Sequence, residues 1–262
     1  MQAETLMHNA GVASYVLELH NVGKTFRSDS GVTVAALRNV DLTVHGGEFV
    51  TLLGATGCGK TTLLNIAAGI TEPDEGYLCR GENVKLGESI AYVFQHYTLF
   101  PWRTTLSNVT FGLQMRGVSR RTRKSKAREL LAKVGLAGFE KARPYELSGG
   151  MRQRAAIAQA LAIEPSLLLM DEPFGAVDDS TRAELQQMLV ELWEGRDMTI
   201  LFVTHNIDEA ILLGSRVVVL AERPGRIVRQ FDVDLPRPRD RNRTRFTELF
   251  LDIRHSLSGG LD

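Results

Sequence analysis

The sequence predicts an α/β fold built on a mostly parallel sheet. Short apolar runs recur along the chain, and such runs are typical of strands that helices cover on both faces. The runs are IAYVF (90–94), SLLLM (166–170), TILFV (199–203) and RVVVL (216–220). Segments with helical spacing separate most of them; in 184–193, three leucines and a methionine fall on one helical face. Alternation of strand and helix predicts the parallel sheet.

Composition is that of an ordinary globular protein. The chain has 262 residues, of which 44% are hydrophobic, with 31 basic and 31 acidic side chains and no formal net charge. This balance argues against a general nucleic-acid binder, so we expect no nucleic-acid partner. Two cysteines indicate no disulfide framework and fit a reducing, cytoplasmic setting. No apolar run approaches the roughly 18–20 residues that span a bilayer.

The first strands precede a glycine-rich loop. We expect residues 1–14 to form a flexible tail, and 15–50 to be strand-like, because Val40, Leu42 and Val44 alternate with polar residues. The apolar run EFVTLL then leads directly into GATGCGKTT, and TTLLNIAAG follows with helical spacing. A strand, a glycine-rich loop and a helix in this order are the context that a P-loop requires.

The loop at 54–62 is predicted to bind the phosphates of ATP. Its glycines let backbone N–H groups approach a phosphate chain, Lys60 reaches the outer phosphates, and the Thr61 hydroxyl can hold Mg²⁺. Cys58 lies at the helix start, where a thiolate is favoured, and we interpret it as a packing residue that is also reactive. The predicted ATP-binding residues of the loop are Gly54, Ala55, Thr56, Gly57, Cys58, Gly59, Lys60, Thr61 and Thr62.

Four further residues are catalytic or metal-binding candidates, since each follows a predicted strand. Asp171 ends an apolar strand and would hold Mg²⁺ opposite Thr61, while Glu172 can deprotonate the attacking water. His205, after 199–203, can donate a hydrogen bond to the γ-phosphate. Gln95, after 90–94, can contact Mg²⁺ or water. Taken singly, His205 and Gln95 fit turn residues equally well.

A second phosphate cradle is predicted at LSGGMRQR. Ser148, Gly149 and Gly150 open a helical segment, so bare N–H groups and the positive helix end meet at one point. One nucleotide needs only one cradle. The second therefore raises the question of which phosphate it serves.

In chain order the motifs are GATGCGKTT, VFQ, LSGGMRQR, LLLMDEP, GAVD and VTH. This ordered set resembles the nucleotide-binding subunit of ATP-binding cassette (ABC) transporters over roughly residues 15–230. The resemblance implies a P-loop NTPase core with an N-terminal antiparallel β-subdomain and an inserted helical subdomain. It also implies a head-to-tail homodimer in which Ser148, Gly149 and Gly150 grip the ATP of the other copy. Asp178 of GAVD matches the D-loop at that interface, and Phe26 matches the aromatic residue that stacks on adenine.

Two stretches resemble the importer subunits for nitrate, sulfonates and taurine. They are FPWRTTLSNVTFGL (100–113) and LAERPGRIVRQFDVDLPRPR (220–239). The implied partners are integral membrane permease subunits and, acting through them, a periplasmic or extracellular solute-binding protein. The implied location is the cytoplasmic face of the cell membrane. Trp102 either contacts the permease or packs on its own subdomain.

The domain organisation expected from these patterns has three parts. An ABC ATPase domain covers 15–235 with a helical subdomain at about 100–150, and 236–262 form a basic linker and a C-terminal helix. The basic segment 120–128 is either a solvated helix face or lies near anionic lipid.

The alternative function is a soluble ABC ATPase of repair, cluster assembly or translation. Such proteins usually carry coiled coils or a second cassette, and this sequence shows neither. A binding module with little turnover would be expected to lack Glu172 or His205.

Overall fold

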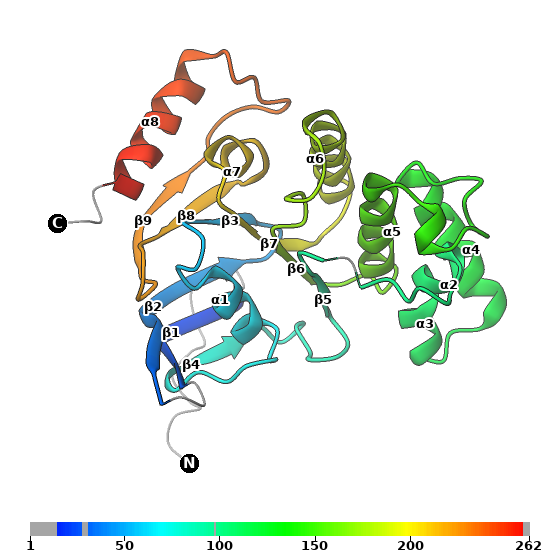
Figure 1. The fold of residues 1–262 in the computed structure, drawn as a ribbon, viewed down its shortest axis with the longest axis horizontal. Coiled ribbons are helices and arrows are strands. Elements are labelled where there is room, and N and C mark those ends of the chain that lie inside the picture. The colour runs from blue at the N-terminus through cyan, green and yellow to red at the C-terminus, as the bar shows by residue number, and fades with distance from the viewer. Residues whose placement is uncertain (1–14, 28–30, 97, 259–262) are drawn as a thin grey trace.

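The computed structural model describes residues 15–27, 31–96 and 98–258 (Figure 1). The predicted tail, 1–14, lies outside the described residues. No helix within the described ranges is long and apolar enough to cross a membrane.

A six-stranded sheet forms the centre of the molecule, in the order β5-β6-β7-β3-β8-β9. Its strands are β3 (Phe49–Leu53), β5 (Ile90–Val93), β6 (Leu167–Asp171), β7 (Thr199–Thr204), β8 (Arg216–Leu220) and β9 (Ile227–Asp232). All neighbours pair in parallel except β8 and β9, which are antiparallel. The structure confirms the predicted α/β class and the mostly parallel sheet.

A three-stranded antiparallel sheet, β2-β1-β4, packs across helix α1 (Lys60–Ala67) from the central sheet (Figure 1). Its strands are β1 (Tyr15–Arg27), β2 (Thr33–His45) and β4 (Glu75–Arg80). Val40, Leu42 and Val44 of β2 are all buried, as their alternation with polar residues predicts. Helix α1 is thus held between two sheets, so its N-terminus is fixed at one edge of both.

The other face of the central sheet packs on helices. Alternate residues of the strands serve the two faces: Leu168 and Met170 of β6 face the helices, while Leu167 and Leu169 face α1. Helices α5 (Gly149–Leu161) and α6 (Asp179–Glu194) share that core. Helices α2 (Thr105–Val109), α3 (Phe111–Met115) and α4 (Arg120–Lys133) form a lobe with α5 at one side of the molecule (Figure 1). The insertion predicted to be mostly helical is helical.

The C-terminal helix α8 (Thr244–Ser258) docks on its own domain. Its residues Phe246 and Ile253 are buried against α7 (Ile207–Leu213) and β8. The charged segment before it carries more structure than a linker. Arg237 donates hydrogen bonds to Leu212 O and Leu213 O, and Arg239 donates to several carbonyls, including Gly214 O, so both arginines bind the open carbonyls at the end of α7.

Strands β4 and β9 are absent from the sequence prediction. Both lie at sheet edges, and most of their side chains are exposed or half-buried. An edge strand needs few apolar residues, so its sequence lacks the continuous apolar run that marks the buried strands.

Candidate nucleotide-binding site

The glycine-rich loop joins β3 to α1 at the carboxyl edge of the central sheet. Strand β3 is buried throughout and pairs with β7 on one side and β8 on the other, so it delivers the loop to the middle of that edge. Gly57 and Gly59 have φ angles of +82° and +104°. A Cβ at Gly59 would lie 2.6 Å from Ala36 O, so only glycine fits there. The glycine conformations let backbone N–H groups of the loop face a phosphate chain.

Lys60 and Thr61 begin helix α1 and meet the end of β6. The Nζ of Lys60 is buried, donates to Gly54 O at 2.7 Å and to Ala55 O at 2.9 Å, and lies 3.7 Å from Glu172 Oε1. The Thr61 hydroxyl donates to Asp171 Oδ1 at 3.1 Å. The structure therefore brings together the four residues that the sequence assigns to phosphate, metal and water.

Asp171 is a buried carboxylate with too little positive charge nearby. Burial raises its pKa above the usual range, and the neighbouring Glu172 adds to this, against the Thr61 hydroxyl and the Lys60 ammonium, which lower it. A divalent cation at Asp171 and Thr61 would stabilise the charged form of the Asp171 carboxylate. Oxygen ligands of this kind are those that Mg²⁺ prefers, so the residues present fit that metal.

We expect Asp171→Asn to stabilise the nucleotide-free chain while removing its metal-dependent ATP binding. The raised pKa means that the charged form costs folding free energy at pH values above that pKa, and the cost vanishes as the pH falls below the ordinary carboxyl range. Asparagine keeps the oxygen that accepts from Thr61. The expected rise in unfolding midpoint is about 2–4 °C at pH 7, which corresponds to roughly 1 kcal/mol, and it should shrink towards pH 4.

Differential scanning fluorimetry from pH 4 to 8 measures this shift. Asp197→Asn, at an exposed aspartate, is the matched control and should leave the midpoint unchanged at every pH. A lower midpoint for Asp171→Asn at pH 7 would contradict the account of a destabilising buried charge.

Glu172 and His205 lie side by side on the same edge. Glu172 has φ +41°, a conformation that few non-glycine residues adopt, and its N–H donates to Val203 O at 3.1 Å. Its Oε2 lies 3.0 Å from His205 Nδ1. The side chain of Glu172 is mostly buried while that of His205 is more than half exposed. A carboxylate held between Lys60 and His205 can accept a proton from a water molecule beside it.

A buried network positions His205, and sequence reasoning missed it. Glu209 on α7 accepts from the Thr204 hydroxyl at 2.5 Å and from Gln186 Nε2 at 2.9 Å. The side chain of Asn206 accepts from the N–H of Glu209 and so begins α7. The end of β7 and the start of α7 are thereby fixed on either side of His205. The signal in the sequence was a group of polar residues directly after a buried strand: Thr204, His205, Asn206 and Glu209.

A cavity of about 280 Å³ lies over the loop. Phe26, Val34 and Ala36 give it an apolar part, and its other lining residues are Thr56, Gly57, Gly59, Lys60, Thr61, Thr62, Gln95, Asp171, Glu172 and Arg223. Phe26 is 46% exposed, so part of its ring is accessible to a base, and Lys24 Nζ lies 5.7 Å from the ring centroid. Gln95 lines the same cavity as Asp171 and Thr61. One end of the cavity thus suits an aromatic base and the other a phosphate chain with its metal.

Cys58 differs from the prediction. Burial raises the pKa of its thiol, and this outweighs the opposing effect of Lys60, so the expected thiolate at the helix start is wrong. The side chain is 2% exposed and packs in the core with Leu220. Cys58 does not line the cavity, and neither do Gly54 and Ala55, whose carbonyls bind Lys60 instead. The packing interpretation is confirmed and the reactive one is not.

The second cradle lies away from this cavity. The Ser148 hydroxyl accepts from Met151 N–H at 3.3 Å and so begins α5. Gly149 has open space where a Cβ would be, and none of Ser148, Gly149 and Gly150 lines the nucleotide cavity. Asp178 begins α6: its carboxylate accepts from Ser180 and Thr181, which hold its pKa well below the usual range. Neither motif reaches the nucleotide site of its own chain.

The sequence analysis does not predict two further residues that lie at or beside the cavity. Arg223 lines the cavity from the loop after β8. Tyr92 on β5 donates to Asn65 Oδ1 at 3.1 Å and lies beside Asp171; burial, with that carboxylate, raises the pKa of its phenol. Both come from elements far from the loop in sequence, so no local pattern points to them.

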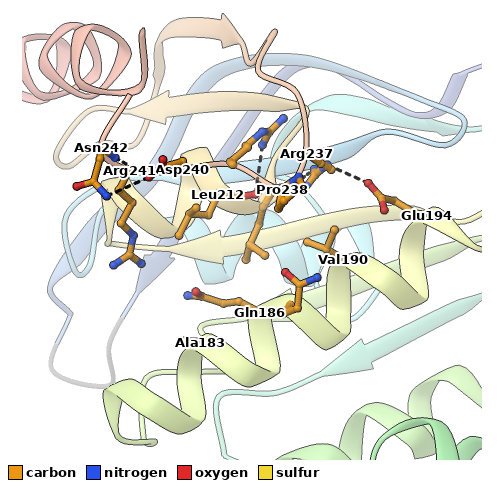
Figure 2. A pocket seen from close by; sticks show the side chains of 13 residues that line it. Ala183, Gln186, Val190, Glu194, Leu212, Arg237, Pro238, Asp240, Arg241 and Asn242 are labelled. Carbon is orange, nitrogen blue, oxygen red and sulfur yellow. Dashed lines mark hydrogen bonds and ion pairs between the residues drawn. The ribbon is translucent and has the colours of Figure 1, made fainter. Parts of the chain in front are cut away.

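A larger cavity of about 700 Å³ separates α6 from residues 237–242 (Figure 2). Two of the arginines that line it already have partners. Arg237 binds the end of α7 and lies 3.5 Å from Glu194. Arg239 donates to carbonyls through all three of its nitrogens. We assign no part of the nucleotide chemistry to this cavity.

Fold and site together define a P-loop nucleotide-binding protein, and comparison with known proteins specifies which kind. Residues 37–175 match the ABC transporter family. An uncharacterized ABC transporter ATP-binding protein of Methanocaldococcus jannaschii is 50% identical, over 88% of this chain and 87% of the relative. The taurine import ATP-binding protein of Rhizobium johnstonii is 46% identical, over 85% of this chain and 86% of the relative. The nitrate import ATP-binding protein of a Synechocystis strain is 44% identical, over 84% of this chain and 83% of the relative.

Among solved structures, a dimeric ATP-binding cassette bound to ADP and phosphate is 33% identical, with a TM-score of 0.74, and covers 84% of this chain and 100% of its own. The chain belongs to the ABC transporter family, as an ATP-binding subunit whose ATPase activity is coupled to transport.

Proposed function

We propose that the chain is the ATP-hydrolysing subunit of an ABC importer. It works as a homodimer beneath integral membrane permease subunits at the cytoplasmic face of the cell membrane, and a solute-binding protein delivers the solute to the permease. The observation that carries this proposal is that the two predicted phosphate cradles, at Lys60 and at Ser148, lie apart, and only the first lines the cavity over the glycine-rich loop. The second is left for the ATP of another copy.

The roles proposed for the site residues follow from their geometry. The loop at 54–62 and Lys60 bind the phosphates, and Phe26 lies where it can stack on adenine. Mg²⁺, when bound at Thr61 and Asp171 with Gln95 nearby, neutralises charge on the phosphate oxygens. Glu172 accepts a proton from the water whose oxygen attacks the γ-phosphorus, while the bond to the bridging oxygen breaks and ADP leaves. His205 orients Glu172 through the 3.0 Å contact and donates towards the γ-phosphate.

For the solute we propose a small anion or zwitterion such as nitrate, a sulfonate or taurine. The support is that relatives named for the import of taurine, nitrate and aliphatic sulfonates are 42–46% identical over most of the chain. A soluble ABC ATPase outside transport gains no support from these relatives. The solute itself contacts the other subunits, so the assignment belongs to the whole complex.

We propose that Trp102 contacts the permease. It lies at the start of the helical lobe, before α2, where its ring lies 5.5 Å from that of Phe100 and its side chain is 69% exposed. The contact with Phe100 fixes one edge of the indole, and the rest of its apolar surface stays open. A large, exposed and positioned aromatic side chain is typical of the residues that dominate protein interfaces.

The test is ATP-dependent uptake of nitrate, taurine and an alkanesulfonate into vesicles that contain the complex. The parent complex should take up at least one of them, and Trp102→Ala should lower the uptake about tenfold or more, because an interface tryptophan typically contributes at least 1–2 kcal/mol. The isolated variant should bind ATP and unfold as the parent does.

Tyr77→Ala is the matched control, since Tyr77 is an exposed aromatic residue on β4, far from the helical lobe (Figure 1). Unchanged uptake in Trp102→Ala would refute the permease contact, as would a fall in the thermal midpoint of the isolated variant. A parent complex that hydrolyses ATP and imports none of the three solutes would refute the solute class.

A further inference from the structure

Arg223 lies in the loop that joins β8 to β9, and this loop packs on the nucleotide site. Gly225 N–H donates to Ala36 O at 2.9 Å, and Arg38 N–H donates to Gly225 O at 3.0 Å, so the loop is bonded to β2 beside the apolar part of the cavity. A Cβ at Gly225 would lie 2.0 Å from Cys58 O, so the loop also touches the phosphate-binding loop directly. Its position is fixed from two sides before any ligand arrives.

The side chain of Arg223 extends from this loop onto the phosphate-binding loop. Its Nε donates to Gly57 O at 2.8 Å, and one terminal nitrogen lies 3.1 Å from where a Cβ of Gly57 would be. The side chain lines the cavity together with Lys60 and Thr62. Among the described residues, the two terminal nitrogens of Arg223 have no hydrogen-bond partner. One donor orients the guanidinium, and the exposed side chain lines the cavity, so its remaining donors can bind a ligand there.

Charge balance favours a role for these open donors. Two carboxylates, Asp171 and Glu172, face the cavity, and Lys60 is the other cation in it. The Nζ of Lys60 is occupied by two carbonyls of its own loop in this state. A guanidinium that presents a fixed fork of N–H donors is well suited to phosphate oxygens.

We propose that Arg223 is a nucleotide-binding residue, whose terminal nitrogens bind phosphate oxygens of ATP and ADP. This inference rests on the proposed function, because it requires ATP in the cavity over the loop. The contact is made with the phosphates before and after hydrolysis. It therefore contributes to the binding of both nucleotides.

The test is equilibrium binding of ADP to the full-length chain, measured by isothermal titration calorimetry at several salt concentrations. We expect Arg223→Ala and Arg223→Gln to bind ADP about tenfold more weakly, as for the loss of a charge-assisted hydrogen bond. Glutamine can still donate to Gly57 O, so its loss of affinity reports the charge. The decline of affinity with salt should be less steep in both variants, because one cation has left the site.

Arg226→Ala is the matched control, since Arg226 has the same charge in the same loop and does not line the cavity. It should bind ADP as the parent does. Three results would overturn the proposal. If Arg223→Gln binds ADP with the parental affinity, Arg223 only holds the loop in place. If binding is weaker but its salt dependence is parental, the contact is with the base or the ribose; and if Arg226→Ala loses as much affinity for ADP, the effect is not specific to Arg223. If the parent itself binds no nucleotide, the proposed function fails and this inference fails with it.

Discussion

Glu172→Gln is expected to bind ATP as the parent does and to hydrolyse it about 10²–10³-fold more slowly, because a positioned general base typically contributes 10²–10⁴-fold. The carboxylate contacts His205 at 3.0 Å and lies 3.7 Å from Lys60, so both neighbours are already placed to hold it beside the attacking water. Glutamine has the same shape and cannot accept the proton. ATP should then persist in the site, and the dimer should remain closed around it.

The measurements are phosphate release for turnover and size-exclusion chromatography with ATP for the dimer. Glu248→Gln, on the exposed side of α8, is the matched control and should turn over ATP at the parent rate. If Glu172→Gln hydrolyses ATP as fast as the parent, another group is the base. If it loses ATP binding as well, Glu172 acts in binding and the assignment is wrong.

Mixing two inactive variants is expected to restore nucleotide-dependent dimers. Lys60→Ala damages the site whose loop contains it, and Ser148→Arg damages the opposite site, where the added side chain fills the space meant for the γ-phosphate. In a mixed dimer, one site combines the intact Lys60 of one copy with the intact Ser148 of the other. The other site carries both changes. The mixture should therefore form ATP-dependent dimers where neither variant does alone, and recovered ATPase activity would follow if one intact site suffices.

The structure supplies a second variant for this experiment. Ser148 begins helix α5, so its replacement also removes a cap that is typically worth about 1 kcal/mol. Gly149→Asp leaves the cap in place, enters open space, and sets a negative charge against the phosphate. It should behave as Ser148→Arg does in the mixture. Ser125→Arg, an exposed position on α4, is the control and should dimerise like the parent.

If mixing restores neither dimers nor turnover while the parent shows both, the two-copy site is refuted. Dimers formed by Gly149→Asp alone would refute the role of the second cradle as well.

The buried strands and the phosphate loop could be predicted from sequence because their signals are local. A strand covered on both faces must be apolar throughout, and a loop that must pass close to Ala36 O needs glycine at 59. Asp171, Glu172 and His205 could be placed at one edge by the rule that parallel strands end together. The edge strands β4 and β9 could not, since exposed edges impose no such pattern.

Several features depended on tertiary contacts alone. The sequence placed Cys58 at a helix start and suggested a thiolate, but only packing against the core decides that burial raises the pKa of its thiol. The sequence predicts that the charged segment containing Arg237 and Arg239 is a linker. Only the folded structure shows that both side chains bind carbonyl groups at the end of α7.

The sequence by itself determined the fold class, the family and the candidate residues for binding and cleaving ATP, because those functions require particular residue types at fixed spacings within short segments. Only the tertiary structure decided which segments meet over the loop. Arg223 reaches Gly57 from 166 positions away along the chain, and Gln186 binds Glu209 across two helices. Such contacts depend on which loops and helices the strand order of the sheet brings together in space. The spacing of residues within one segment does not determine them.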